Sequence, residues 1–216
     1  MTTSPRGAVL QRDGETYAII PSLNGGLLDL PTLKKLTEVV EKYQIPIVKL
    51  TGAQRLALVG MQGKDVENIW NDLGMEPAPA VGNVVRSIQT CPGNAVCKNG
   101  KQNSLALSSK LQELFLGKGL PSKLKMGVSG CPICCAEPWL RDIGLFGKSD
   151  GWTVVVGGCA AGRPRIADFI TEGLSDDKAV ELVGKIINVY ADNAKKGERI
   201  GKLIDRIGLE EFKALI

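Results

Sequence analysis

Apolar residues recur along this 216-residue chain with two different periods. Short alternating or continuous apolar runs predict strands, whereas apolar positions three or four residues apart predict helices. The predicted strands cover residues 15–20, 45–50, 83–88, 123–128, 143–146 and 152–156. The predicted helices cover residues 29–43, 64–73, 103–116, 175–190, 199–207 and 210–215. This mixture of strands and helices favours a fold of the α+β class.

Residues 75–80 carry two prolines and no apolar period, which is typical of a linker. We therefore expect a boundary near residue 78, with one domain at residues 1–78 and another at residues 79–216. With 44% hydrophobic residues, the chain is long enough to bury a substantial core.

The charge balance and the N-terminus exclude several classes of protein. The 27 basic and 23 acidic residues are too evenly balanced for a nucleic-acid-binding protein. No secretory signal is recognisable, and no apolar run approaches the roughly 20 residues that span a bilayer. We expect a cytoplasmic protein with neither nucleic-acid nor membrane partners, in which the six cysteines are ligands or free thiols.

Five of the six cysteines lie between residues 90 and 139. They form two groups, and their positions are Cys91, Cys97, Cys131, Cys134 and Cys135. The chain has no histidine, which excludes mixed Cys/His zinc sites and histidine-based catalytic dyads. The pattern predicts an all-thiolate 4Fe–4S cluster. A structural zinc site and inert buried thiols remain alternatives, although zinc ligand pairs usually lie only about two to four residues apart.

Two cysteine motifs carry a resemblance to a known family. Thr90-Cys-Pro-Gly-Asn-Ala-Val-Cys97 and Ser129-Gly-Cys-Pro-Ile-Cys-Cys-Ala136 resemble the paired signature of sirohaem-dependent nitrite and sulfite reductases. Residues 25–29 and 50–55 resemble the ferredoxin-like half domain of that family. The resemblance implies a small ferredoxin-like half domain followed by an α/β domain that binds a 4Fe–4S cluster and sirohaem.

The same resemblance implies a role for each cysteine. Cys91, Cys97, Cys131 and Cys135 would be the cluster ligands, and Cys135 would also bridge to the sirohaem iron. Cys134 departs from the family pattern, which usually has a small residue other than cysteine there. Because Cys131 and Cys134 have the spacing of bacterial ferredoxins, Cys134 remains an alternative ligand. Cys159 is expected to be a loop or core residue.

The substrates of this family, sulfite and nitrite, are small oxyanions. Because the chain has no histidine, arginine and lysine side chains would have to bind the anion and relay protons to it. By position, Arg55 and Arg86 resemble the family arginines that serve the substrate or the sirohaem carboxylates. Lys123 and Lys125 resemble its substrate-binding lysine pair. For any one of these side chains considered alone, a solvated surface charge is the simpler interpretation.

A glycine-rich loop adds to the predicted cofactor site, because its backbone amides can approach a ligand closely. A flexible connection is the simpler interpretation of such a loop. The cofactor-binding residues predicted from the resemblance are Cys135, Arg55, Arg86, Gly157, Gly158 and Arg163. Arg141 and Arg165 are weaker candidates for the same role.

The resemblance implies a six-electron reduction of sulfite to sulfide or of nitrite to ammonia. A separate protein must donate the electrons, since the chain has no flavin or nicotinamide fingerprint. Larger relatives contain two copies of this unit, so we expect a homodimer. Two alternatives stay open: a non-catalytic iron–sulfur electron-transfer or accessory protein, favoured by Ala53 where many relatives have arginine, and a zinc-stapled binding module.

Overall fold

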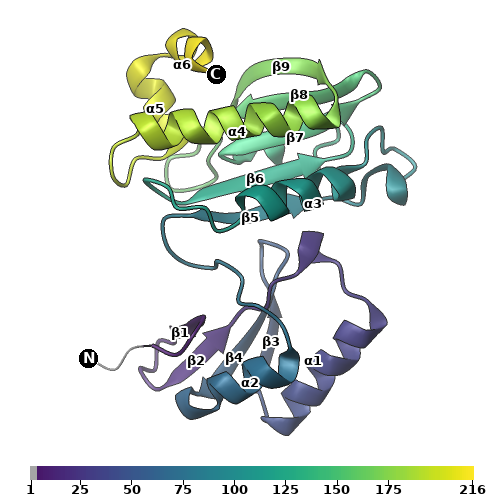
Figure 1. Cartoon of the computed structure of the whole chain (residues 1–216), viewed down its shortest axis with the longest axis vertical. Coiled ribbons are helices and arrows are strands. Elements are labelled where there is room, and N and C mark those ends of the chain that lie inside the picture. The colour runs from purple at the N-terminus through teal and green to yellow at the C-terminus, as the bar shows by residue number, and fades with distance from the viewer. Residues whose placement is uncertain (1–3) are drawn as a thin grey trace. The chain divides into compact units, whose positions relative to one another are not determined.

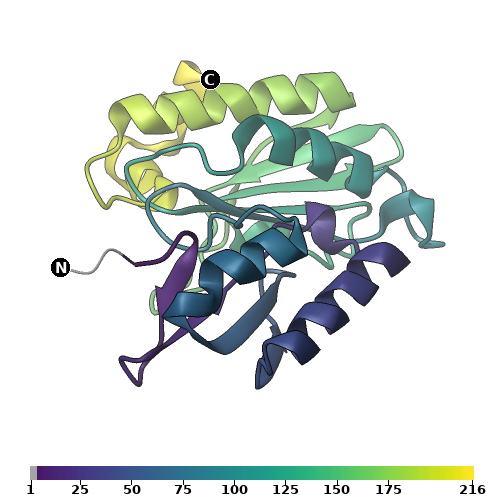
Figure 2. The same cartoon turned by 60° about the horizontal axis from the view of Figure 1, so that its bottom comes forward.

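The computed structural model describes residues 4–216, and the chain divides into two compact units, residues 1–80 and 81–216. The first unit contains an antiparallel sheet in the order β1-β2-β4-β3, and α1 and α2 lie side by side on one face of it (Figures 1 and 2). Its elements are β1 (Ala8–Leu10), β2 (Thr16–Ile19), α1 (Leu30–Lys42), β3 (Ile47–Leu50), β4 (Leu56–Gln62) and α2 (Val66–Leu73).

Local signals in the sequence set the ends of these helices. The side chain of Asp29 accepts a hydrogen bond from the backbone N–H of Thr32 and so caps α1. Pro31 occupies the first turn of α1, where its missing N–H costs nothing. Gly74 ends α2 in the left-handed conformation, with φ of 61°. Apolar side chains from both helices then pack on the fully buried Ile19 and Leu58 of the sheet.

The second unit is built on a five-stranded sheet in the order β5-β6-β7-β8-β9. Strands β5, β6 and β7 run parallel, while β8 and β9 are each antiparallel to the strand before. Its elements are β5 (Val85–Thr90), α3 (Ser104–Phe115), β6 (Leu124–Ser129), β7 (Ile143–Lys148), β8 (Gly151–Val156), β9 (Asp168–Leu174), α4 (Asp176–Asn193), α5 (Ile200–Ile207) and α6 (Leu209–Leu215).

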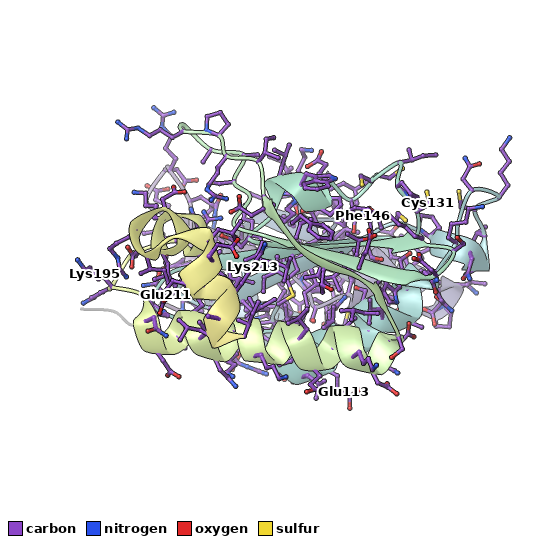
Figure 3. The ribbon with its side chains drawn as sticks, turned by 90° about the horizontal axis from the view of Figure 1, so that it is seen from above. Glu113, Cys131, Phe146, Lys195, Glu211 and Lys213 are labelled. Atoms are coloured by element: carbon purple, nitrogen blue, oxygen red, sulfur yellow. The ribbon has the colours of Figure 1, made fainter. Side chains whose placement is uncertain are left out.

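The two faces of this sheet differ in composition. Met126, Leu145 and Val154 belong to the core that α3 and α4 complete on one face. At alternate positions the opposite face carries small residues, among them Gly127 and Gly144. Figure 3 shows α4 on one side of the sheet and the labelled Cys131 and Phe146 on the other. The face with small residues therefore leaves room for the loops that carry the cysteines.

The structure confirms the predicted α+β class and every predicted helix and strand, with small shifts at their ends. It also contains β1, β4 and β9, which the apolar pattern did not reveal. β7 extends beyond its predicted end at residue 146 to Lys148, and β8 begins at Gly151, one residue before its predicted start. Within residues 4–216, none of the helices is both long and apolar enough to cross a bilayer.

Candidate functional site

Cys91 and Cys131 lie just beyond the carboxyl ends of two neighbouring parallel strands, β5 and β6. The backbone N–H of Cys91 donates to the carbonyl of Val128 over 3.1 Å. The backbone N–H of Gly130 donates to Sγ of Cys91, also over 3.1 Å. The parallel register thus brings two cysteines that are forty residues apart in sequence to one end of the sheet.

The loop that carries Cys97 is fastened to the same residue, Gly130. Its carbonyl accepts hydrogen bonds from the backbone N–H groups of Lys101 and Gln102, over 2.7 and 3.0 Å. A Cβ atom on Gly130 would lie 2.5 Å from Cα of Gly93, so only glycine fits at this contact. The N–H of Cys97 donates to the carbonyl of Gly93 over 2.9 Å, which sets the turn that holds Cys97.

Helix α3 begins beside Cys91. The hydroxyl of Ser104 donates to the carbonyl of Cys91 over 2.7 Å, and its Oγ lies 3.5 Å from Sγ of Cys91. Asn103 caps the helix by accepting from the N–H of Ala106 over 3.1 Å. The amino end of a helix carries partial positive charge, which favours a thiolate or another anion close to it.

Cys135 and its neighbour Cys134 have different surroundings. Cys135 is exposed, and the next N–H, that of Ala136, donates to Oγ of Ser129 over 3.0 Å. Cys134 is half-buried and packs beside Trp139 against the apolar cluster that contains Phe146. Burial raises the pKa of the Cys134 thiol to about 11, while a hydrogen bond with the side chain of Trp139 lowers it by less.

Cys134 also has an unusual backbone conformation, with φ of 59°. This left-handed region is uncommon for residues other than glycine. It lets the chain turn sharply between Cys131 and Cys135, and the N–H of Cys134 donates to the carbonyl of Cys131 over 3.2 Å.

The donor chemistry at this end of the sheet suits an iron–sulfur cluster. It offers thiols, a backbone N–H directed at sulfur and a helix amino end. Among residues 4–216, no three cysteine or carboxylate side chains are arranged to hold a single metal ion. Cys97 and Cys135 are exposed, Cys91 is half-buried and Cys131 is buried, so the thiols line the surface where a cluster could be seated.

The predicted lysine pair lies at the other end of β6. Lys125 is the second residue of β6, and Lys123 lies directly before the first residue of that strand. Both side chains are half-buried. Burial lowers the pKa of Lys125, and the positive charges of Arg141, Lys123 and Arg199 lower it further. A lysine in such surroundings releases its proton more readily than an exposed one.

A buried ion pair supports this basic end of the sheet. Asp142, whose side chain is only 2% exposed, accepts two hydrogen bonds from Arg199, from Nε over 2.8 Å and from Nη2 over 2.6 Å. It also accepts from the backbone N–H of Lys125 over 2.8 Å. Burial raises the pKa of Asp142, and the charge of Arg199 opposes that shift. The sequence analysis did not predict this ion pair. The only local signal for it is that Asp142 stands directly before the apolar strand β7.

Three of the predicted cofactor-binding residues line one cavity. Gly157, Gly158 and Arg163 border a space of about 280 Å³, together with Arg199 and Lys202. A Cβ on Gly158 would lie 2.6 Å from the carbonyl oxygen of Arg141, so a larger residue would displace that backbone. The lining also includes Arg165 and the carboxylates of Asp142 and Asp205, so its four basic groups exceed its two acidic ones, which suits the carboxylate groups of a ligand.

The other candidates named from the sequence have structural roles or lie elsewhere. Arg165 is held by Asp168 and Asp205, over 2.6 and 3.0 Å. Nη2 of Arg141 binds Glu137 over 2.5 Å. Cys159 lies in the loop after β8 and forms two backbone hydrogen bonds with Arg165, as expected for a loop residue.

Arg86 and Arg55 belong to different units. Arg86 is half-buried in β5, where its Nε donates to the carbonyl of Gly82 over 2.8 Å. Arg55 is half-buried and lies in the first unit, directly before β4.

The second unit therefore has two chemically distinct ends. The cysteines follow the carboxyl ends of β5 and β6, and the lysines lie at the amino end of β6, about 20 Å away along a six-residue strand. The cavity is at the lysine end, since Ile143 at the start of β7 pairs with Val156, the residue before Gly157. The face with small residues connects the thiols to the cationic groups.

Comparisons with known proteins agree with this arrangement. Residues 81–216 match the family model of the nitrite and sulphite reductase 4Fe-4S domain, and residues 9–75 match that of the nitrite/sulfite reductase ferredoxin-like half domain. The chain is 44% identical over 216 residues to an assimilatory-type sulfite reductase of Nitratidesulfovibrio vulgaris, covering 100% of this chain and 99% of that protein.

Two further similarities are more distant. The chain is 36% identical over 209 residues to a nitrite reductase [NAD(P)H] of Bacillus subtilis, covering 97% of this chain but only 26% of that protein. The crystal structure of dissimilatory sulfite reductase I has the same fold, with a TM-score of 0.81 at 13% identity, covering 93% of this chain and 68% of that one. The resemblance noted in the cysteine motifs is confirmed, and the chain belongs to the nitrite and sulfite reductase family of oxidoreductases, in a form with a single repeat.

Proposed function

We propose that this chain uses a 4Fe–4S cluster and sirohaem to reduce sulfite to sulfide, or nitrite to ammonia, by six electrons. The observation that carries the proposal is the convergence of the cysteine loops on Gly130. Its N–H binds Sγ of Cys91, its carbonyl holds the loop of Cys97, and Cys131 follows it directly. The match of residues 81–216 to a 4Fe-4S domain supports the same conclusion.

In this proposal Cys91, Cys97, Cys131 and Cys135 would hold the cluster, and Cys135 would also serve as a ligand of the sirohaem. The exposure of Cys135 supports that choice, because a bridging thiolate must be reachable from both groups. The packing of Cys134 against Trp139 and Phe146 argues against Cys134 as the ligand.

When bound, the cluster and the sirohaem would deliver electrons from a separate donor protein to the substrate. The chain itself binds the anion and supplies protons as the oxygen atoms leave as water. Lys123, Lys125, Arg86 and Arg55 are proposed to bind the oxyanion. The lowered pKa of Lys125 supports a role as a proton donor.

Gly157, Gly158 and Arg163 are proposed to bind the carboxylates of the sirohaem. The cavity of about 280 Å³ that they line supports this, since it can take acidic side groups of the ligand. The cytoplasm is the proposed compartment, because its thiols stay reduced and all six cysteines of this chain are free.

Sulfite is the first substrate to test, since the relative from Nitratidesulfovibrio vulgaris, which matches this chain over both full lengths, is named an assimilatory-type sulfite reductase. The experiment is an anaerobic assay of the purified protein with reduced viologen, in which sulfide and ammonia are measured separately. Sulfide from sulfite, or ammonia from nitrite, is the expected result. A protein that contains both cofactors but consumes neither anion would instead be an electron-transfer or accessory protein.

A further inference from the structure

Two buried polar atoms of the second unit have no hydrogen-bond partner in the protein. They are Oγ of Ser87, a residue that is 4% exposed, and Nε of Arg141, whose side chain is 12% exposed. Neither atom forms a hydrogen bond with any of residues 4–216. Because a buried polar atom without a partner costs free energy, such atoms are typical of places where a protein binds a ligand.

The strand register places Ser87 beside Lys125. β5 and β6 are neighbours (Figure 1), and Ser87 lies directly opposite Lys125 in their parallel pairing. The next pair, Ile88 and Met126, belongs to the core under α3 and α4. Since side chains alternate between the faces of a sheet, Ser87 and Lys125 both point to the face with small residues.

Arg141 lies across the same face, a short distance further along β6. A Cβ atom on Gly127 would lie 2.9 Å from Cγ of Arg141, so the arginine side chain fills the space that this glycine leaves. Gly127 is two residues after Lys125 and about 7 Å from it along the strand. Nη2 of Arg141 binds Glu137, which holds the guanidinium in place while Nε stays without a partner among the described residues.

The chemistry of these groups defines the ligand. An arginine Nε and a lysine ammonium can only donate hydrogen bonds, and a serine hydroxyl can donate one as well. Basic residues outnumber acidic ones around the site, with Lys123, Lys125, Arg141 and Arg199 against Glu137 and Asp142. The ligand must therefore carry negative charge and offer several lone pairs.

We propose that Ser87 and Arg141 join Lys125 in binding the substrate oxyanion and make the site selective for sulfite over nitrite. This inference rests on the proposed function, in which one of these anions is reduced. Sulfite has three oxygen atoms and carries up to two negative charges, whereas nitrite has two oxygen atoms and one charge. Three donors, from β5, β6 and the segment before β7, match three oxygens. Nitrite would leave one buried donor unpaired, which is the strongest form of discrimination between similar ligands.

The cavity at the lysine end gives the anion a way in. Gly158 and Asp142 both line this space of about 280 Å³. A Cβ on Gly158 would lie 2.6 Å from the carbonyl oxygen of Arg141, and Oδ2 of Asp142 accepts from the backbone N–H of Lys125 over 2.8 Å. The cavity therefore borders both cationic residues of the site.

The test is calorimetric titration of the oxidised protein with its cofactors, using sulfite and nitrite separately and no reductant. We expect the wild type to bind sulfite more tightly. Ser87→Ala and Arg141→Lys should each weaken sulfite binding about 10-fold or more and nitrite binding less than ~3-fold, because each loses a hydrogen bond to a charged ligand. Arg141→Lys keeps the positive charge and so isolates the loss of Nε.

Thr153→Val is the matched control. Thr153 is 1% exposed and its Oγ1 also lacks a hydrogen-bond partner within residues 4–216, but it lies on β8, two strands from Lys125. This variant should leave both affinities unchanged. Thermal unfolding provides a second measurement, because loss of an unpartnered hydroxyl should not lower the midpoint of Ser87→Ala. A lower midpoint would show that the hydroxyl supports the fold and would overturn its role in binding.

The titrations distinguish this site from the proposed activity. A wild type that does not prefer sulfite overturns the proposal, as does a Ser87→Ala protein that binds sulfite normally or loses both anions equally. Sulfite binding with the expected pattern in a protein that reduces neither anion would support the site and overturn the activity. Reduction without that pattern would support the activity and overturn the site.

Discussion

The backbone N–H of Gly130 points at Sγ of Cys91 over 3.1 Å, joining the ends of two parallel strands. Hydrogen bonds from backbone amides to sulfur stabilise the thiolate form and tune the reduction potential of iron–sulfur clusters. The same residue holds the loop of Cys97 through its carbonyl. Gly130 thus links the loops that carry Cys91, Cys97 and Cys131.

Gly130→Ala should disturb the cysteine site, because its Cβ would lie 2.5 Å from Cα of Gly93. We expect a loss of about 1–3 kcal/mol in the free energy of unfolding, as for other overpacked sites. Bound iron and acid-labile sulfide should fall as well. Gly119→Ala is the control, since nothing lies within 4 Å of a Cβ there, and it should change stability by less than ~0.5 kcal/mol. Full iron content in Gly130→Ala would show that the contact does not position the thiols.

Replacing Cys134 and Cys135 separately by serine should separate their roles. Cys134→Ser should keep iron and sulfide, because its thiol packs with Trp139 and Phe146. Cys135→Ser should lose the cluster and the spectroscopic coupling between cluster and haem. Iron analysis and absorbance spectra measure both effects. Cluster loss confined to the Cys134 variant would reverse our assignment.

Lys125 should control the alkaline limb of the pH–rate profile. Its protonated form is present below its pKa, which burial and neighbouring cations lower, so activity should fall as pH rises through that value. Lys125→Arg keeps the positive charge at high pH, but its guanidinium does not release its proton, so the rate should drop and this alkaline fall should disappear. Lys125→Met should reduce kcat/KM by about 10²–10³-fold. Lys178→Met, on the exposed side of α4, is the control and should leave the rate unchanged. An identical profile for Lys125→Arg and the wild type would exclude this role.

Asp142→Asn should destabilise the second unit, because it leaves Arg199, whose side chain is only 18% exposed, without its anionic partner. Breaking one side of a buried ion pair typically costs about 3–5 kcal/mol. Denaturant unfolding measures the change. Asp150→Asn in the exposed turn between β7 and β8 is the control and should be nearly neutral. A similarly small change at Asp142 would mean that the pair contributes little to the fold.

The parts of the fold that sequence reasoning predicted are those with strong local signals. α1 and α4 have capping residues and clear apolar periods, and both form as expected. β4 was missed because Gly60 interrupts its apolar run, and β9 because none of its residues is buried. β9 is an edge strand, and its structure depends on pairing with β8, which a local pattern does not contain.

The candidate site was predicted unevenly for the same reason. The spacing of Cys91 and Cys97 is visible in the sequence, whereas the contact of Gly130 with Gly93 depends on the parallel register of β5 and β6. Likewise, Asp142 and Arg199 are 57 residues apart and meet only in the folded unit. Long-range pairs such as these carry no periodic signal.

Chemical analysis of the protein purified without air shows whether the cysteines hold an iron–sulfur cluster. Iron, acid-labile sulfide and zinc should be measured on the same sample as its absorbance spectrum. We expect four iron and four sulfide per cluster, a further iron in sirohaem with isobacteriochlorin absorption bands, and no stoichiometric zinc. Stoichiometric zinc without sulfide or a haem spectrum would contradict this expectation and would identify the cysteines as a structural staple.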